Sequence, residues 1–437
     1  METHLSPEFA STPEGQQAEA ILRNCVHCGF CTATCPTYQL LGDELDGPRG
    51  RIYQIKQVLE GAAPTRTTQL HLDRCLTCRN CETTCPSGVE YGKLVDIGRA
   101  VVDAKVERPA GEKFARWALR EGMTSSLFAP AIKLGQALRP LVPAALRDKV
   151  PPRQRAGKRP QRDHARKVLM LDGCVQPTLM PNIGAATARV LDAVGVQPLL
   201  ADGAGCCGAI RQHLSDHGGA LADMKRNIDA WWPLVESGTV EAIVMDASGC
   251  GAMVKEYGHH LLHDPAYADR AQRISALCQD ISEYLPQFAA PLKTLLSGKR
   301  RAAPSFPDPL GGRAGHATDQ GTPNPKPVDH LAYHPPCTLQ HAQQVRGGAE
   351  SLLRELGFEV KLPLESHLCC GSAGTYSVMQ PELSKDLRNR KLQHLAEIAP
   401  QRIVSSNIGC IQHLQAGTTI PVQHWVELLD EALHGKP

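Results

Sequence analysis

The pattern of hydrophobic and polar residues changes near residue 167, from helical spacing to alternating strands and helices. Residues 17–24 and the chain from Pro86 to about residue 122 have helical patterns, and so does the segment between the cysteine runs that carries Ile52, Ile55, Val58 and Leu59. Residues 1–16 are polar and indicate a loose tail. We therefore expect an all-α domain over residues 1–110.

A connector follows at residues 111–167. Residues 124–150 mix apolar residues with Lys133, Arg139 and prolines. Because proline breaks a long helix, we expect a packed connector here rather than one amphipathic helix on a membrane surface. Residues 151–167 are basic and proline-rich, which is typical of a solvated linker.

From Lys167 onward, apolar strand patterns alternate with helical patterns, and the order occurs twice. The first copy has strands at 168–171, 197–200 and 241–245 and helices at 183–194, 221–235 and 274–285. The second copy has strands at 330–333, 359–362 and 402–405 and helices at 348–356, 383–398 and 422–433. This predicts an α+β multidomain protein in which the helical domain precedes two repeated α/β units with parallel strands, at 168–297 and 329–437, joined by a Pro- and Gly-rich linker at 298–328.

The composition has one outlier, which is 17 cysteines in 437 residues. Eight of them form two runs with the spacing C-x2-C-x2-C-x3-C-P, namely Cys25, Cys28, Cys31, Cys35 and Cys75, Cys78, Cys81, Cys85. This is the ligand spacing of ferredoxins with two 4Fe-4S clusters, in which the fourth cysteine of each run binds the other cluster. Zinc is the alternative for C-x2-C pairs, but a tetrahedral zinc ion has no use for the third C-x2 step.

We therefore expect two 4Fe-4S clusters with crossed ligands. The first is assigned to Cys25, Cys28, Cys31 and Cys85, and the second to Cys75, Cys78, Cys81 and Cys35. Nearby Arg49 and Arg51 either stabilise an anionic cluster, face a partner, or are solvated surface residues.

Each α/β unit carries four more cysteines in a shared pattern, and Cys278 of the first unit stands apart from it. The first unit has Cys174, Cys206, Cys207 and Cys250, and the second has Cys337, Cys369, Cys370 and Cys410. The interval of 31 residues before the Cys-Cys pair is the same in both units. Each cysteine follows a predicted strand, so it lies at the C-terminal edge of a parallel sheet, the usual place for a site in such a sheet.

The two units resemble the cysteine-rich CCG domains of heterodisulfide reductase and related respiratory subunits. The resemblance is carried by Gly205-Cys-Cys-Gly208, Asp246-Ala-Ser-Gly-Cys-Gly251 and Tyr333-His-Pro-Pro-Cys337. With the stretches Asn24–Tyr38 and Gly42–Arg51, the order of modules is similar to that of the iron-sulfur subunits of glycolate oxidase. It covers about residues 20–435, apart from the Pro- and Gly-rich stretch.

The resemblance implies the electron-transfer subunit of a glycolate dehydrogenase complex, an oxidoreductase acting on a CH-OH donor. We find no flavin or dinucleotide fingerprint in the sequence, so hydride chemistry belongs to partner flavoprotein subunits, and this chain holds no catalytic residue. The implied acceptor is a respiratory quinone. The alternatives are a subunit of a related lactate or glycerol-3-phosphate dehydrogenase, a disulfide reductase resembling heterodisulfide reductase, and a module that only docks partners.

The CCG pattern of the family ends in C-x-x-C, but Met253 and His413 replace the fifth cysteine here. The four cysteines left in each unit are sufficient for a further iron-sulfur cluster, or else they are small buried residues of the scaffold. Imidazole is a fair ligand for iron and thioether a weak one. Four further histidines either transfer protons or have ordinary surface and core roles: His334, His341, His367 and His424. The isolated Cys278 is expected to be a buried hydrophobic residue.

Charge and the remaining patterns exclude several classes. A net charge of +2 and 4% aromatic residues give no basis for nucleic-acid binding. We see no signal peptide and no apolar stretch of about 18 residues, so we expect no transmembrane segment. Cysteines in C-x2-C runs favour metal binding in a reducing compartment. We expect a cytoplasmic protein, with peripheral association at the inner face of the cytoplasmic membrane as a further expectation.

Overall fold

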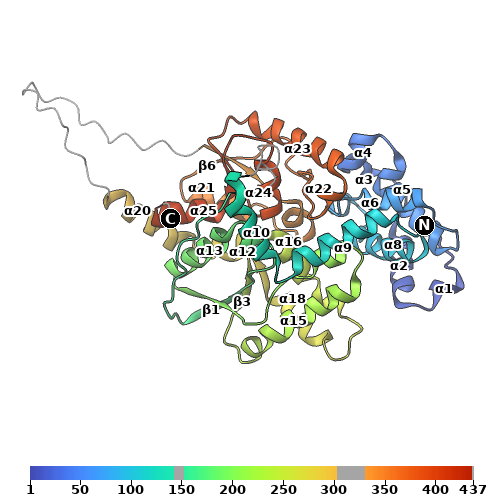
Figure 1. Ribbon diagram of the computed structural model, residues 1–437, viewed down its shortest axis with the longest axis horizontal. Coiled ribbons are helices and arrows are strands. Elements are labelled where there is room, and N and C mark those ends of the chain that lie inside the picture. The colour runs from blue at the N-terminus through green and yellow to red at the C-terminus, as the bar shows by residue number, and fades with distance from the viewer. Residues whose placement is uncertain (142–151, 303–329, 436–437) are drawn as a thin grey trace, which may run out of the picture.

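A computed structural model describes residues 1–141, 152–302 and 330–435. Within these ranges, helices alone form the N-terminal part, and two four-stranded parallel sheets follow. Figure 1 shows the N-terminal helices in blue at one end of the molecule and the two sheets with their helices beside them. The α+β multidomain organisation predicted from the sequence is confirmed.

Short helices joined by tight loops make up the N-terminal part. They are α1 (Pro7–Ala10), α2 (Pro13–Asn24), α3 (Phe30–Ala33), α4 (Pro36–Leu41), η1 (Glu44–Asp46), α5 (Pro48–Leu59), α6 (Arg66–Asp73), α7 (Asn80–Thr84) and α8 (Tyr91–Lys105). Proline begins α4 directly after Cys35, because its fixed φ suits the first helical position. Helices α5 and α8 approach closely at Gly98, where a Cβ atom would lie 2.5 Å from the Ile55 side chain.

The prediction of a loose tail at residues 1–16 is wrong. Helix α1 buries Phe9, and Thr12 caps α2 by accepting a hydrogen bond from the Gly15 amide. The N-terminal ammonium donates to the carbonyl oxygens of Leu22 at 3.1 Å and Cys25 at 2.6 Å. These contacts join the start of the chain to the first cysteine loop. The polar composition of residues 1–16 gave no hydrophobic period from which this packing could be predicted.

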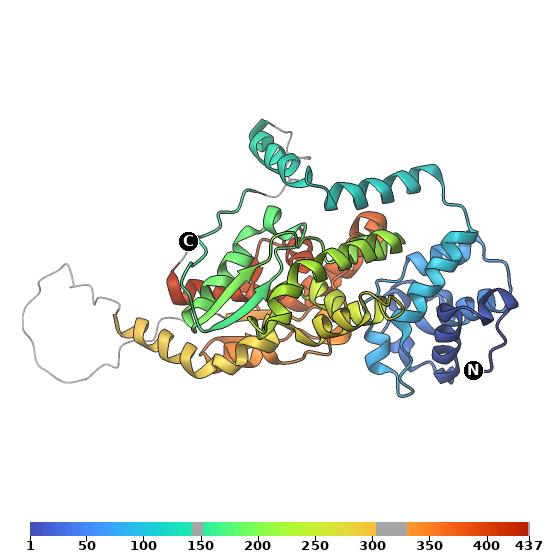
Figure 2. The same cartoon turned by 90° about the horizontal axis from the view of Figure 1, so that it is seen from below.

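The connector consists of α9 (Ala110–Thr124), α10 (Phe128–Leu138) and η2 (Arg139–Leu141). In Figure 2, α9 and α10 form a teal band along one side of the molecule. Neither helix has a buried residue, and Leu127 and Leu141 are 73% and 81% exposed. The expectation of a packed connector is therefore wrong for this part, and residues 142–150 lie outside the described ranges.

The first sheet has strands β1 (Arg166–Met170), β2 (Val196–Leu200), β3 (Ala242–Met245) and β4 (Cys278–Asp280), in the order β2-β1-β3-β4 and all parallel. Its helices are α12 (Gln176–Leu179), α13 (Pro181–Ala193), α14 (Ala209–His213), α15 (His217–Glu236), α16 (Ser248–Lys255), α17 (Tyr257–His260), α18 (Ala268–Leu277), α19 (Ile281–Tyr284), η3 (Leu285–Phe288) and α20 (Ala289–Ala302). Helix α20 extends into the linker expected at residues 298–328, because it includes residues 298–302. Residues 303–329 lie outside the described ranges.

The second sheet repeats this topology. Its strands β5 (His330–His334), β6 (Glu359–Lys361), β7 (Arg402–Ser405) and β8 (Val422–His424) have the order β6-β5-β7-β8 and are parallel. Its helices are η4 (Thr338–Ala342), α21 (Gly348–Glu355), α22 (Tyr376–Met379), α23 (Pro381–Ala396), α24 (Ile408–Gln415) and α25 (Trp425–His434).

Each unit also contains a fourth strand that the sequence pattern did not predict. The helix expected at 274–285 is interrupted by β4, and the helix expected at 422–433 begins with β8. Both strands have three residues, and the last residue of each, Asp280 or His424, caps the next helix with a capping box. A strand this short has no visible period and merges with the helical pattern beside it.

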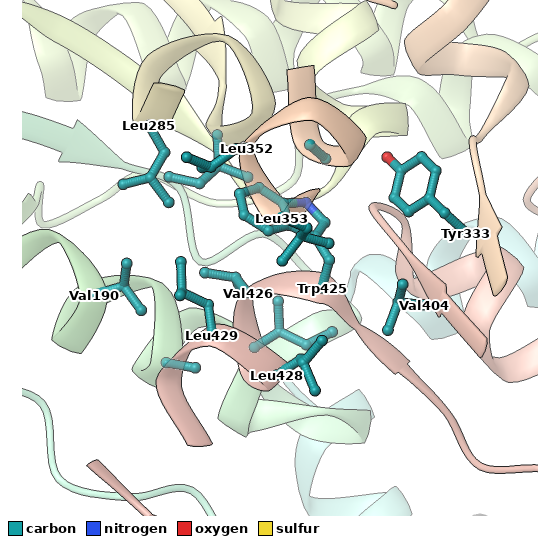
Figure 3. Packing of buried hydrophobic residues seen from close by; sticks show 14 of the residues in the cluster. Val190, Leu285, Tyr333, Leu352, Leu353, Val404, Trp425, Val426, Leu428 and Leu429 are labelled. Carbon is teal, nitrogen blue, oxygen red and sulfur yellow. The ribbon is translucent and has the colours of Figure 1, made fainter. Parts of the chain in front are cut away.

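The two units share one hydrophobic core. Figure 3 shows Val190 of α13 close to Val426 and Leu429 of α25, with Leu352 and Leu353 of α21 above them. Trp425 lies in the same cluster and is 0% exposed. The amide of Ser248, which follows β3, donates to the carbonyl of Ser406, which follows β7, at 3.1 Å. This packing brings the C-terminal edges of the two sheets together.

Candidate metal sites

The sixteen cysteines assigned from the sequence occur in four groups. Set A is Cys25, Cys28, Cys31 and Cys85; set B is Cys35, Cys75, Cys78 and Cys81; set C is Cys174, Cys206, Cys207 and Cys250; set D is Cys337, Cys369, Cys370 and Cys410. None of these sixteen cysteines forms a disulfide.

The residues of set A line one small cavity together with Pro86 and Arg49. The pKa of Cys31 is raised to about 11. Burial is the largest cause, and the neighbouring thiols of Cys25 and Cys85 contribute less. Cys85 thus lies beside the loop of the other run. His27 and Gly29 have φ values of 58° and 83°, and these left-handed residues wrap the loop around the cavity. Thr77 and Arg79 repeat this turn in the second run, with φ values of 52° and 59°.

The residues of set B line a second cavity, which Arg51 and Tyr91 complete. The Sγ atom of Cys75 accepts hydrogen bonds from the Thr77 amide at 3.4 Å and the Tyr91 hydroxyl at 3.6 Å. Burial opposes ionisation of Cys75, but the charges of Arg51 and Arg99 outweigh it, and the pKa of this thiol is lowered. Converging thiols with N–H and O–H donors are the environment that an iron-sulfur cluster requires.

Arg51 is a buried residue and not a solvated surface arginine. Its guanidinium donates to the carbonyl of His71 at 2.7 Å and to Asp46 at 3.3 Å. Asp46 is 0% exposed and also accepts from Arg74 at 2.9 Å. The network holds a fixed positive charge next to set B. Arg49, in contrast, is half-exposed and pairs with Glu44 at 2.6 Å.

Set D lies against set B. Leu76, Cys337, Cys369 and Tyr376 form one apolar cluster with Cys78 packed against it. Burial, and then the nearby Cys337, raises the pKa of Cys78. Helix α7 docks onto the second unit here, because Asn80 Nδ2 donates to the His367 carbonyl at 3.3 Å and Thr83 Oγ1 lies 2.9 Å from His341 Nδ1.

The first unit, which contains set C, has its own contacts with the N-terminal part. Arg79 forms a two-point ion pair with Glu256, and its Nη2 donates at 2.7 Å. Hydrogen bonds from Cys174 and Cys207, together with the charge of Arg226, lower the pKa of Cys206. Cys250 lies next to Cys207, so the four thiols of set C form a continuous group.

The glycine of each Cys-Cys-Gly motif has a structural role. Gly208 and Gly371 have φ values of 93° and 89°, and their amides donate to the Sγ atoms of Cys206 at 3.5 Å and Cys369 at 3.4 Å. A Cβ atom at Gly371 would lie 2.4 Å from the carbonyl oxygen of Ser384. Only glycine therefore allows this turn, which aims one thiol of each pair at its neighbours.

The residues that replace the fifth cysteines have other contacts. Met253 is buried in the hydrophobic core of the first unit. His413 Nε2 lies 3.1 Å from Ser384 Oγ and 3.2 Å from the Ser384 carbonyl. The structure instead brings His334 to Cys370 and Cys410, with ligand atoms within 4.8 Å of one another. Its position three residues before Cys337, at the end of a strand, was the only sequence signal for this arrangement. Cys278 is buried, as expected.

Sets C and D open on one cavity of about 540 Å³ between the N-terminal part and the two sheets. Thiols of both sets line it, as do Arg99, His213 and His260. Burial lowers the pKa of His213 and His260, so both imidazoles are neutral near pH 7. A cavity of this volume accommodates a small organic molecule.

The helices of residues 1–141, 152–302 and 330–435 include none with both the length and the apolar character needed to cross a membrane. Comparison with protein families finds a 4Fe-4S dicluster domain at residues 21–89 and a cysteine-rich domain, the CCG domain, at residues 168–255 and 331–415. These matches contain sets A and B and sets C and D respectively, and they support iron-sulfur clusters in this chain.

Comparison with individual proteins finds relatives that match the whole chain or part of it. The chain is 49% identical over 436 residues to the glycolate oxidase iron-sulfur subunit of Escherichia coli K12, covering 99% of both chains. It is 27% identical to the probable glycolate oxidase iron-sulfur subunit of Bacillus subtilis 168, covering 91% of this chain and 89% of the relative. Lactate utilization protein A of Oceanobacillus iheyensis is 25% identical over 62% of this chain and 98% of its own length.

Proposed function

Because the chain belongs to the family of glycolate oxidase iron-sulfur subunits, we propose that it passes electrons from flavoprotein partners that oxidise glycolate to glyoxylate towards a respiratory quinone. The observation that carries this proposal is the order of the thiol sets, since set A reaches the surface, Cys81 of set B lines the same small cavity as set A, and Cys75 of set B lines the central cavity. The proposed division of the chain is a ferredoxin domain at residues 1–110, a connector with a basic linker at 111–167, the first CCG unit at 168–297, a linker at 298–328 and the second CCG unit at 329–437.

Set A and set B are the proposed ligands of the two 4Fe-4S clusters, with the crossed assignment given by the spacing. Such clusters supply one-electron transfer when bound. The proximity of Cys85 to Cys31, and the lining of one cavity by Cys35 with Cys75 and Cys78, support this assignment. The amide and hydroxyl donors at Cys75 favour the thiolate that a cluster requires.

The surface at set A is the proposed docking site of a flavoprotein partner. Cys28 is exposed, and Val26 and Phe30 beside it are 68% and 61% exposed. Exposed apolar residues next to a redox group suit an interface that brings two redox groups close together. A partner seated there would also exclude water from set A.

The central cavity is the proposed acceptor site. It is lined by thiols of sets C and D and by the neutral His213 and His260. Apolar lining residues such as Leu171, Leu179 and Leu214 suit a quinone ring, and the two imidazoles are groups that can accept and release its protons.

Peripheral attachment to the inner face of the cytoplasmic membrane is proposed through α10 and its flanking residues. Leu127, Leu134 and Leu138 are 73%, 61% and 45% exposed, and Lys133 and Arg139 lie in the same segment. Exposed leucines next to cations are typical of a surface that enters the interface of an anionic bilayer.

Anaerobic reduction of the purified complex tests the electron-transfer proposal. Adding glycolate to the complex is expected to generate the EPR signal of reduced clusters, and adding it to this chain alone is not. C28S is expected to reduce the glycolate-dependent signal, while the matched variant C278S keeps it, because Cys278 is buried in β4 away from the surface at set A. The proposal fails if lactate or glycerol 3-phosphate reduces the clusters of the complex and glycolate does not.

A second candidate function is reduction of a small disulfide in the central cavity, because thiols of both set C and set D line it. Loss of the fifth cysteine in both units counts against it. Viologen-driven reduction of a heterodisulfide by this chain without partners would favour this candidate over electron transfer to a quinone.

A further inference from the structure

The side chain of His334 is an unusual member of the second unit's core. It is the last residue of β5 and is 0% exposed, and within the described residues neither ring nitrogen has a hydrogen-bond partner. A buried imidazole with two unpartnered nitrogens is unfavourable, because both nitrogens lose their contacts with water. A bound ligand would remove this cost.

The neighbours of His334 are metal ligands. One of its ring nitrogens and the Sγ atoms of Cys370 and Cys410 all lie within 4.8 Å of one another, and all three residues are buried. Cys369 directly precedes Cys370, and its thiol interacts with that of Cys370, so it provides a fourth thiol next to the group. Bonds of about 2.0 Å to nitrogen and about 2.3 Å to sulfur separate neighbouring ligand atoms of a tetrahedral ion by roughly 3.5–3.8 Å, so small side-chain rotations would complete the site.

The first unit differs at this position. Leu171 stands three residues before Cys174, as His334 stands three residues before Cys337, and it is buried in the core of the first unit. The two units match in the order of their strands and in all four cysteines, but the nitrogen ligand is present only in the second. The difference between the units is therefore a difference in ligand chemistry.

We propose that His334, Cys370 and Cys410, with Cys369 as the fourth ligand, bind a single transition-metal ion, either zinc or ferrous iron. Mixed thiolate and imidazole ligands in a tetrahedral arrangement select these ions. The site is separate from the cluster sites at sets A and B, and it replaces the cluster that the four cysteines of set D allow. The inference goes beyond the proposed function, because occupancy of this site is measured whether or not the chain carries electrons.

Metal and acid-labile sulfide analysis of the anaerobically purified chain tests this site. Clusters contribute iron and sulfide in equal numbers, so a single ion appears as about one zinc per chain or about one iron in excess of sulfide. The variant H334L introduces the residue of the first unit and is expected to lose this ion while the sulfide content stays unchanged. H334C supplies a thiolate and is expected to keep the ion. H413Q is the matched control, because His413 contacts Ser384.

The unchanged sulfide content of H334L also reports that the N-terminal part has folded. If H334L does not fold, the ligands of the ion are measured in the wild-type chain instead. X-ray absorption at the zinc edge is the method for zinc, and Mössbauer spectroscopy is the method for ferrous iron. One nitrogen and three sulfur ligands are expected. Three results would overturn the site: no metal beyond the sulfide-matched iron, extra iron matched by extra sulfide, or an H334L variant that keeps the ion.

Discussion

At the scale of single residues, buried polar groups around the thiols set the chemistry of each metal site. Arg51 and Arg99 bring positive charge to Cys75, whereas Cys31 has mainly burial and other thiols around it. Positive charge and hydrogen bonds to sulfur both favour the reduced, more negative state of a cluster. The two clusters proposed for sets A and B therefore have different surroundings, although their sequence motifs are the same.

The Tyr91 hydroxyl provides a test of this difference. We expect Y91F to lower the midpoint potential of the set B cluster, because the bond from Tyr91 to Cys75 Sγ strengthens on reduction. A loss of about 0.5–1 kcal/mol corresponds to roughly 20–40 mV for one electron. An EPR-monitored redox titration measures the shift, and Y53F, at a half-exposed tyrosine, is the control. Equal potentials in Y91F and the wild type would contradict the assignment of Cys75 to this cluster.

Asp246 gives a prediction of pH dependence. Burial raises the pKa of this carboxyl to about 6, and one oxygen accepts a hydrogen bond from Gln176 at 2.7 Å. Because the folded pKa lies above the ordinary value, the group favours folding at pH below about 4, and this contribution is lost as the pH rises through about 6. D246N keeps the acceptor oxygen, so its stability relative to the wild type should increase between pH 4 and pH 6 and then level off.

The expected gain for D246N above pH 6 is at most about 3 kcal/mol, from roughly two pKa units at about 1.4 kcal/mol each. Thermal melting of cluster-loaded protein from pH 4.5 to 8 measures it, with the exposed Asp269→Asn as control for the lost charge. If the difference in melting temperature between D246N and the wild type did not change with pH, the ionisation of Asp246 would not contribute to the pH dependence of stability.

At the scale of elements, short capped helices and left-handed turns position the thiols. Pro36 begins α4 next to Cys35, and the same backbone turn recurs at His27 and Thr77. In the α/β units, the cysteines follow strands, and the glycine after each Cys-Cys pair permits the turn that groups them. The connector helices contrast with these elements, because they bury no residue of their own.

Exposure of α10 leads to a prediction about membranes. Replacing Leu127, Leu134 and Leu138 together with serine should weaken binding to vesicles of anionic phospholipid by tenfold or more, since about 1.4 kcal/mol corresponds to tenfold and burial of one leucine contributes at least that much. Vesicle co-sedimentation measures the affinity. L262S removes a leucine that is 58% exposed in another part of the surface and is the control. Unchanged vesicle binding by the triple variant would assign α10 to a protein partner instead.

At the scale of the whole molecule, docking contacts and the proposed crossed ligands join the parts. Set A combines one loop with Cys85 of the other run, and set B combines the second loop with Cys35. Helix α7 and the preceding residue Arg79 contact both α/β units, through Arg79 to Glu256 and through Asn80 to His367. Loss of a cluster is therefore expected to affect the packing of the N-terminal part against both sheets.

Iron analysis of single cysteine variants tests the crossed assignment. C35S and C85S should each lose about four irons and four sulfides, and the EPR signal that remains should differ between the two variants. C278S changes a buried cysteine of β4 and should keep the full iron content. If C85S removed the cluster held by Cys75, Cys78 and Cys81, each run would bind its own cluster and the crossed assignment would be wrong.

Local patterns in the sequence were sufficient to predict the main elements and to propose the ligand sets. The strands at β1, β3, β5 and β7 and the long helices α13, α15 and α23 occur where the hydrophobic period predicts them, because each buries a face whose spacing is visible within a few residues. Ligand spacing in the two ferredoxin runs also needs no tertiary information, since a short loop wraps one side of a cluster.

Features that depend on contacts between distant segments were decided by the tertiary structure alone. The ordered start of the chain, the short strands β4 and β8, and the burial of Arg51 arise from partners far away in the sequence. Two further features depend on such distant contacts. Set D lies against set B, and His334, rather than His413, approaches Cys370 and Cys410. A local pattern records the chemistry that a residue offers, whereas the packing of remote segments decides which groups meet and which of them lose water.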